Sequence, residues 1–342
     1  MAKPNVHFDG EAFYAPFEKP EYPEITAEYL PSNVHVHFDF GRHLTRGDFE
    51  PTLPKFSACD IYIPEAAGHT ERWEQITRRV SRGDDKLYKQ LKMNTEYDND
   101  TFEAAEFEAI FASHKPIIFI DASSEETTNA YEDDNNLNAR IASGFISPDE
   151  AIAYMYEQDY RTAYDEANRD RIMLENLGPK ICGLLNRNPR LEAKDEVFVL
   201  MRLGATHYPV YTHLAQSPYT ATHVSAETVS YRMLTTILSR IEDKVKLLIE
   251  DNQKIPRHTI LAHSVSFAME DLMPLTTSEP EQLTQEIAIR NIITNTLLAS
   301  GAEEAALLVG RFAHGEETID DRRLIEKHYA DAKRQVVFVK GS

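Results

Sequence analysis

Residues 33–39 read Asn33-Val34-His35-Val36-His37-Phe38-Asp39, a strict alternation of polar and apolar side chains. Side chains of a β-strand alternate between two faces, so this stretch predicts a strand with one apolar face and one face of two histidines and an aspartate. Imidazole and carboxylate groups are common ligands of zinc, manganese and cobalt. The strand therefore predicts a metal site with His35 and His37 as ligands. A half-exposed strand with solvated histidines is the alternative interpretation.

A second strand is predicted by the nearly continuous apolar run at 197–203, which is followed by Gly204-Ala205-Thr206-His207. Such a run is typical of a strand buried on both faces, and the glycine indicates a turn that exposes His207. Both histidine-bearing segments are interpreted as strand ends, where a fold can gather distant ligands. We therefore predict that His35 and His207 reach one shared site, while a purely structural His207 is the alternative.

Strands and long helices alternate along the rest of the chain. The periodicity predicts strands at 59–63, 116–121, 258–262 and 335–339, and helices at 70–93, 101–113, 148–178, 228–249, 281–311 and 318–333. The pattern is typical of an α/β (α+β) fold, with a mixed central sheet flanked by long helices and a helix-rich C-terminal half.

The domain organisation is predicted from proline content and from apolar stripes. Residues 1–31 contain five prolines and many aromatic residues, which favours an extended N-terminal arm. Residues 32–342 are predicted to form a single domain, in which 32–224 carries the motifs and 225–342 is a helical half with a final strand. Residues 208–222, between these parts, are predicted to be a loop over the site.

Composition limits the classes of function. The chain has 342 residues and a formal net charge of -20, which disfavours nucleic acid or anionic membranes as the main partner and leaves a small-molecule or peptide substrate. Cys59 and Cys182 are far apart, so neither a disulfide framework nor a thiolate zinc site is predicted, and a cytoplasmic protein is expected. No apolar run approaches the ~18 residues of a membrane span. The oligomeric state is not predicted.

Several catalytic motifs are absent from the sequence. It contains no G-x-S-x-G, no G-x-x-x-x-G-K-[ST], no G-x-G-x-x-G and no H-E-x-x-H. These absences argue against a serine hydrolase, a P-loop enzyme and a zincin, and no nucleotide cofactor is predicted.

Two charged residues are candidates for catalysis. Glu65 follows the predicted strand at 59–63, where a carboxylate can act as a general base or as a metal ligand. Arg169 shares a helix face with Met173, and an arginine so placed can bind a carboxylate or polarise a carbonyl oxygen. An exposed glutamate and an exposed charged helix are the alternatives.

The order of these motifs resembles a known superfamily. Ser32-Asn33-Val34-His35, Asp60-Ile61-Tyr62-Ile63-Pro64-Glu65, Arg169-Asp170-x-x-Met173 and Gly204-Ala205-Thr206-His207-Tyr208-Pro209 resemble the motifs of the TraB/PrgY, TIKI, ChaN and erythromycin-esterase-like superfamily. The resemblance covers residues 32–209, about half of the chain, although Ser32 stands where the family has Gly. It implies a mixed sheet with His35, Glu65, Arg169 and His207 converging at one end.

The resemblance also implies an activity. The expected function is metal-dependent hydrolysis of an amide or ester, in which Mn, Co or Zn acidifies a water, Glu65 takes its proton and Arg169 stabilises the oxyanion. The first alternative is an amidohydrolase barrel opened by His35-Val36-His37, with His207 and His263 as later ligands. The second is a non-catalytic protein that binds a ligand such as haem or has a regulatory role.

Overall fold

The computed structural model describes residues 6–41, 43, 46–92, 101–124, 148–228, 237–274 and 280–339. The chain divides into two compact units, the first formed by 1–19, 129–164 and 232–342 and the second by 20–128 and 165–231. The chain thus passes from the second unit to the first between residues 231 and 232, close to the boundary predicted at residue 225 between the motif-bearing part and the helical half. The prediction that residues 32–342 form a single domain stays a prediction.

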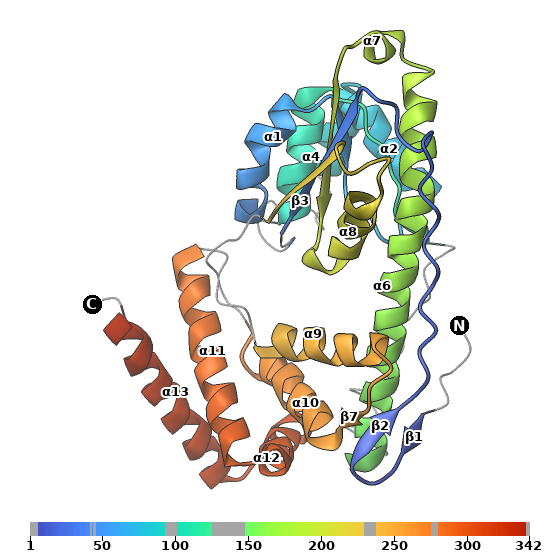
Figure 1. Cartoon of the computed structure of the whole chain (residues 1–342). Helices are drawn as coiled ribbons and strands as arrows, with labels where there is room; N and C mark the ends of the chain where they lie inside the picture. Colours follow the sequence, from blue (N-terminus) through green and yellow to red (C-terminus); the bar gives the residue numbers. More distant parts are fainter. Residues whose placement is uncertain are drawn as a thin grey trace. The chain divides into compact units, whose positions relative to one another are not determined.

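The second unit is built on a parallel sheet (Figure 1). Its strands lie in the order β4-β5-β3-β6, and β3 pairs with β5 in register from Val34 opposite Val197 to Phe40 opposite Leu203. The elements are β3 (Val34–Phe40), α1 (Leu53–Ala58), β4 (Ile61–Ile63), α2 (Glu71–Ser81), α3 (Asp85–Lys92), α4 (Phe102–Ser113), α7 (Pro189–Glu192), β5 (Val197–Leu203), α8 (Tyr208–Gln216), β6 (Val224–Thr228), the short 3-10 helices η1 (Arg46–Asp48), η2 (Glu50–Thr52) and η3 (Ala205–His207), and most of α6 (Pro148–Leu185). The predicted α/β class is confirmed.

One face of the central strands β3 and β5 is wholly apolar. Alternate residues of β3 and β5, from Val34 and Val197 onward, are buried against α6 and α8, as the period-two pattern predicts. The other face carries His35, His37 and Asp39, and α1 and α4 cover part of it with an aromatic core. Two buried polar side chains lie near the carboxyl end of this face, where Asp39 and Arg202 occupy paired positions on β3 and β5.

The first unit contains a small antiparallel sheet and a set of helices. The sheet has the order β1-β2-β7, and the elements are β1 (His7–Phe8), β2 (Ala12–Tyr14), the first part of α6, α9 (Ile237–Glu250), β7 (Ile255–Pro256), α10 (Arg257–Leu272), α11 (Pro280–Ser300), α12 (Ala302–His314) and α13 (Ile319–Val339). Two aromatics of the predicted arm, Phe13 and Phe17, are buried here and pack with Tyr156 and Tyr160 of α6. Within the described residues, no helix combines the length and the apolar composition needed to cross a bilayer.

Four predictions of local structure are wrong. Residues 258–262 lie inside α10 and 335–339 end α13, because a short apolar run has no period that separates a strand from a buried helix. The segment 116–121 makes only an isolated bridge, between Ile117 and Tyr62. The predicted loop at 208–222 begins with α8, where Pro209 occupies a first-turn position that favours a helix start.

Gly178 permits a close approach between α6 and the N-terminal arm. A Cβ atom built there would lie 2.3 Å from the backbone oxygen of Tyr29, whereas one on Gly183 of the same helix would meet only the end of the Arg187 side chain at 3.8 Å. We expect Gly178→Ala to lower the free energy of unfolding by about 1–3 kcal/mol through overpacking. Gly183→Ala is expected to raise it by up to ~1 kcal/mol through helix propensity. Urea denaturation of both variants checks this, and equal effects would contradict it.

Candidate functional site

Several segments of the second unit end at the same edge of the parallel sheet. Parallel strands place their carboxyl ends together, and β3, β4 and β5 are followed there by His43, Glu65 and His207. The segment that bridges to β4 ends in Asp121, and α6 contributes Arg169 and the adjacent Asp170. The strand order explains why residues far apart in sequence meet.

Glu65 lies at the centre of this cluster. Its Oε1 accepts a hydrogen bond from Arg169 Nη2 at 2.9 Å and lies 3.3 Å from His207 Nε2. Its Oε2 accepts from the backbone N–H of Gly204 and lies 3.4 Å from His43 Nδ1. Burial alone would raise the pKa of Glu65, but His207, His43 and Arg169 outweigh it and hold that pKa well below its usual range. Glu65 is therefore ionised at neutral pH.

Gly204 is required by close approach rather than by backbone conformation. Its φ is -64°, which any residue adopts, but a Cβ atom there would lie 3.2 Å from Glu65 Oε2. The absence of a side chain lets the backbone N–H donate directly to the carboxylate.

Arg169 is held by two carboxylates. Nε donates to Asp121 Oδ1 at 3.0 Å and Nη2 to Asp121 Oδ2 at 2.7 Å, in addition to the bond with Glu65. Asp121 is 1% exposed and also accepts from the backbone N–H groups of Ala66 and Ala122. The predicted pairing of Arg169 with Glu65 or another carboxylate is confirmed, and it fixes the planar guanidinium beside Glu65.

His207 is completely buried and lies between two carboxylates. Its Nδ1 is 2.6 Å from Asp170 Oδ1, and Asp170 Oδ2 accepts a hydrogen bond from the Tyr22 hydroxyl at 3.1 Å. Burial opposes the charge on the ring, but Asp170 and Glu65 outweigh it and raise the pKa of His207 to about 9. His207 is therefore an imidazolium at neutral pH.

His43 has the opposite protonation state. Burial lowers its pKa to about 4, with further lowering by the charges of Arg202 and His207. Its ring stacks on Phe102 with centroids 4.4 Å apart, and its buried Nε2 atom has no hydrogen-bond partner within the part of the chain that the structure describes. Since Nδ1 is the nitrogen nearest to ionised Glu65, the proton is assigned to Nδ1 and the lone pair to Nε2. The neutral ring thus offers an acceptor.

The cluster is partly open to solvent. The side chains of Glu65, Arg169 and His43 are 18%, 16% and 21% exposed. Those of Asp121 and His207 are fully buried. Buried Asp121 holds Arg169, and buried His207 contacts Glu65, so the partly exposed side chains are fixed in place, as in a preorganised site.

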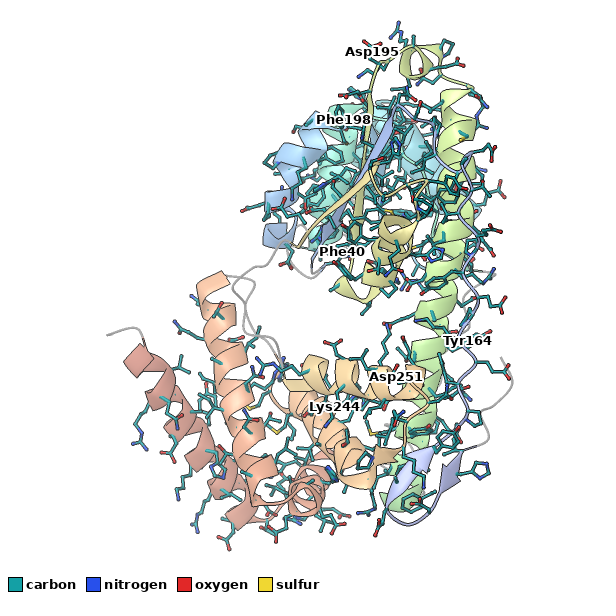
Figure 2. The ribbon with its side chains drawn as sticks, viewed as in Figure 1. Phe40, Tyr164, Asp195, Phe198, Lys244 and Asp251 are labelled. Atoms are coloured by element: carbon teal, nitrogen blue, oxygen red, sulfur yellow. The ribbon has the colours of Figure 1, made fainter. Side chains whose placement is uncertain are left out.

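The structure does not bring the predicted metal ligands together. His207 lies after the carboxyl end of β5, whereas His35 pairs with Phe198 near the amino ends of the strands. His35 is about five residues, or roughly 16 Å, before the end of β3. Figure 2 shows Phe198 and Phe40 at the two ends of this sheet. The prediction that His35 and His207 share a site is wrong, because β3 and β5 are parallel and in register.

The other predicted ligand, His37, is also away from the cluster. It lies about three residues, or roughly 10 Å, before the end of β3, and its Nδ1 is 2.9 Å from the hydroxyl of Ser225 on β6. His35 instead contacts the rings of Phe198 and His223. Of the five predicted site residues, Glu65, Arg169 and His207 are brought together and His35 and His37 are not.

The sequence reasoning missed His43, Asp121, Asp170 and Tyr22. A sequence pattern could have identified His43, because a glycine and then a histidine follow β3 in Gly41-Arg42-His43, as they follow β5 in Gly204-Ala205-Thr206-His207. The sequence pattern that indicates Asp121 is weaker, since this residue only follows the apolar segment 116–120. No local pattern indicated Tyr22, which lies in the arm.

The barrel alternative finds no support in the described residues. An amidohydrolase barrel needs eight βα units, whereas the described parallel sheet has four strands. His263 lies on α10 in the first unit, where its Nδ1 is 3.1 Å from Asp159 of α6. Burial opposes its charge, but Asp159 and Glu242 raise the pKa of His263 to about 10.

The cluster does not fit a metal ion in this arrangement. A shared ion would need Glu65 as a ligand, but both of its oxygens already accept hydrogen bonds and the cationic Arg169 lies next to it. In the part of the chain that the structure describes, no three His, Cys, Asp or Glu side chains are placed to hold a metal. The divalent metal stays a prediction, and no step below goes through one.

Compared with family models, curated proteins and solved structures, the chain matches none. The resemblance to the TraB, TIKI, ChaN and erythromycin-esterase-like superfamily therefore stays a prediction that rests on the quoted motifs.

Proposed function

We propose that the chain is a hydrolase of ester or amide bonds. The observation that supports this most is the neutral His43, whose Nδ1 is 3.4 Å from ionised Glu65 and whose buried Nε2 has no hydrogen-bond partner among the described residues. A carboxylate that orients an imidazole by one nitrogen leaves the other nitrogen, here the buried Nε2, as the acceptor for the proton of a water admitted to the site. In this assignment His43 is the general base and Glu65 orients it.

The same cluster supplies positive charge beside the base. Arg169 and the imidazolium of His207 both contact Glu65 Oε1. When water attacks a carbonyl carbon, the carbonyl oxygen gains negative charge, which fixed N–H donors stabilise without reorganisation. Arg169, whose side chain is partly exposed, is the group that reaches such an oxygen. The sequence-based role of Arg169 is retained, whereas Glu65, with its low pKa, is a poorer base than first predicted.

The test is a panel of substrates followed by chelation. The purified chain is assayed with p-nitrophenyl esters of increasing length and with amino-acid p-nitroanilides, before and after dialysis against EDTA. We expect turnover that survives dialysis. Turnover that is lost and then restored by Mn, Co or Zn would support the metal-dependent alternative and overturn the assigned role of His43. No turnover with any substrate would favour the non-catalytic binding alternative.

The activity is expected to show a bell-shaped dependence on pH. His43 must be neutral to accept a proton, so kcat/KM should fall as pH drops through about 4. His207 must be protonated to stabilise negative charge, so kcat/KM should fall as pH rises through about 9. Because the two groups interact, the limbs report the coupled cluster. A profile of kcat/KM from pH 3 to 11 checks this, and a midpoint near the ordinary histidine value of 6.5 would contradict it.

A further inference from the structure

Tyr22 belongs to the part of the N-terminal arm that lies in the second unit, outside the helices and strands. Its hydroxyl donates to Asp170 Oδ2 at 3.1 Å, and the other oxygen of that carboxylate is 2.6 Å from His207 Nδ1. The opposite nitrogen of the His207 ring is 3.3 Å from Glu65 Oε1. A continuous series of contacts therefore runs from the arm to the centre of the site.

We propose that Tyr22 is a positioning residue, whose hydroxyl fixes the Asp170 carboxylate and through it the orientation and proton affinity of the His207 imidazole. Asp170 is 2% exposed and His207 is completely buried, so water does not replace a lost donor easily. The proposal rests on the proposed hydrolase function only for its effect on turnover.

The direction of the effect follows from the charge of Asp170. A hydroxyl that donates to Oδ2 stabilises the carboxylate charge and weakens the attraction of Oδ1 for the His207 proton. Without that donor, Asp170 holds the proton on His207 more strongly. Among the described residues, the other charged or titratable groups that act on His207 include Glu65 after β4, Arg169 on α6 and His43 after β3, and the substitution leaves these side chains in place.

Tyr208 provides a matched control. It follows His207 directly and lines, together with Tyr22, a cavity of about 370 Å³ whose other walls are Pro209, Thr212, His213 and Gln216. Its hydroxyl makes no hydrogen bond to Asp170 in the described structure. Tyr208→Phe therefore removes a hydroxyl from the same cavity without touching the series of contacts.

The test is an NMR titration of the full chain labelled with ¹⁵N-histidine. In Tyr22→Phe we expect the midpoint of the His207 imidazole to rise by about half a pKa unit, as the loss of one hydrogen bond implies, while Tyr208→Phe leaves it unchanged. Replacing Tyr22 by 3-fluorotyrosine strengthens the donor with little change in shape, so the midpoint should fall. This second variant decides the question even if Tyr22→Phe does not fold.

Identical midpoints in the wild type and in the folded Tyr22 variants would overturn the proposal. With an ester that the wild type hydrolyses, kcat of Tyr22→Phe is expected to fall about fivefold at an unchanged KM, because the His207 imidazolium, although still protonated, loses its fixed orientation. If the wild type hydrolyses no substrate, the hydrolase proposal fails, but the titration still decides the role of Tyr22.

Discussion

His43→Gln is expected to lower kcat/KM for an ester that the wild type hydrolyses by about 1,000-fold, within the range of rate that a positioned general base supplies. Glutamine retains a donor near Glu65 but has no nitrogen that accepts a proton. The fold is expected to survive, because the ring is neutral and its side chain is 21% exposed. Turnover is measured together with the urea midpoint, which separates lost chemistry from lost structure.

The control for this variant is His35→Gln. The sequence pattern favoured His35 as a ligand, yet the structure places it near the opposite end of β3, where it contacts Phe198 and His223. We expect its turnover to stay within twofold of the wild type. If His35→Gln abolished activity and His43→Gln did not, both the site described above and the assigned base would be wrong.

Arg169→Lys is expected to lower kcat by about 100-fold and the free energy of unfolding by about 2 kcal/mol. Lysine keeps the positive charge but lacks the planar fork that binds Asp121 through two nitrogens and also reaches Glu65. The buried Asp121 carboxylate would lose part of its pairing, and the donor for the carbonyl oxygen would move. Kinetics and urea denaturation of the same preparation check the two effects.

Arg171→Lys is the matched substitution on the same helix. Arg171 donates to Asn168 and Glu175, and its side chain is 30% exposed, so the change is expected to alter stability by less than about 0.5 kcal/mol and kcat hardly at all. If Arg169→Lys lowered stability but left kcat unchanged, the guanidinium would hold the fold together without a part in the chemistry.

For the two central strands, the local sequence pattern predicted which side chains lie on which face of the sheet. Alternation in residues 33–39 placed His35 and His37 on one face of a strand, and the continuous apolar run at 197–203 indicated the buried β5. Glu65 and His207 were predictable as well, because each lies in the short segment that follows such a strand. Period and turn chemistry are properties of a few consecutive residues, which the sequence displays in full.

The pairing between strands decided which residues come together at the site. A strand pattern gives the face of a side chain but not the end of the sheet that it shares with another strand. Because β3 and β5 run parallel and in register, the histidine that lies with His207 beside Glu65 is His43, beyond the end of β3, rather than His35 near its start. The same long-range packing brings Asp121 to Arg169 and Tyr22 to Asp170, over separations of 48 and 148 residues. The sequence by itself determined the class of fold, three of the site residues and the pairing of Arg169 with a carboxylate such as Glu65. Only the tertiary structure decided which other groups contact them, since protonation and hydrogen bonding depend on neighbours that no local pattern specifies.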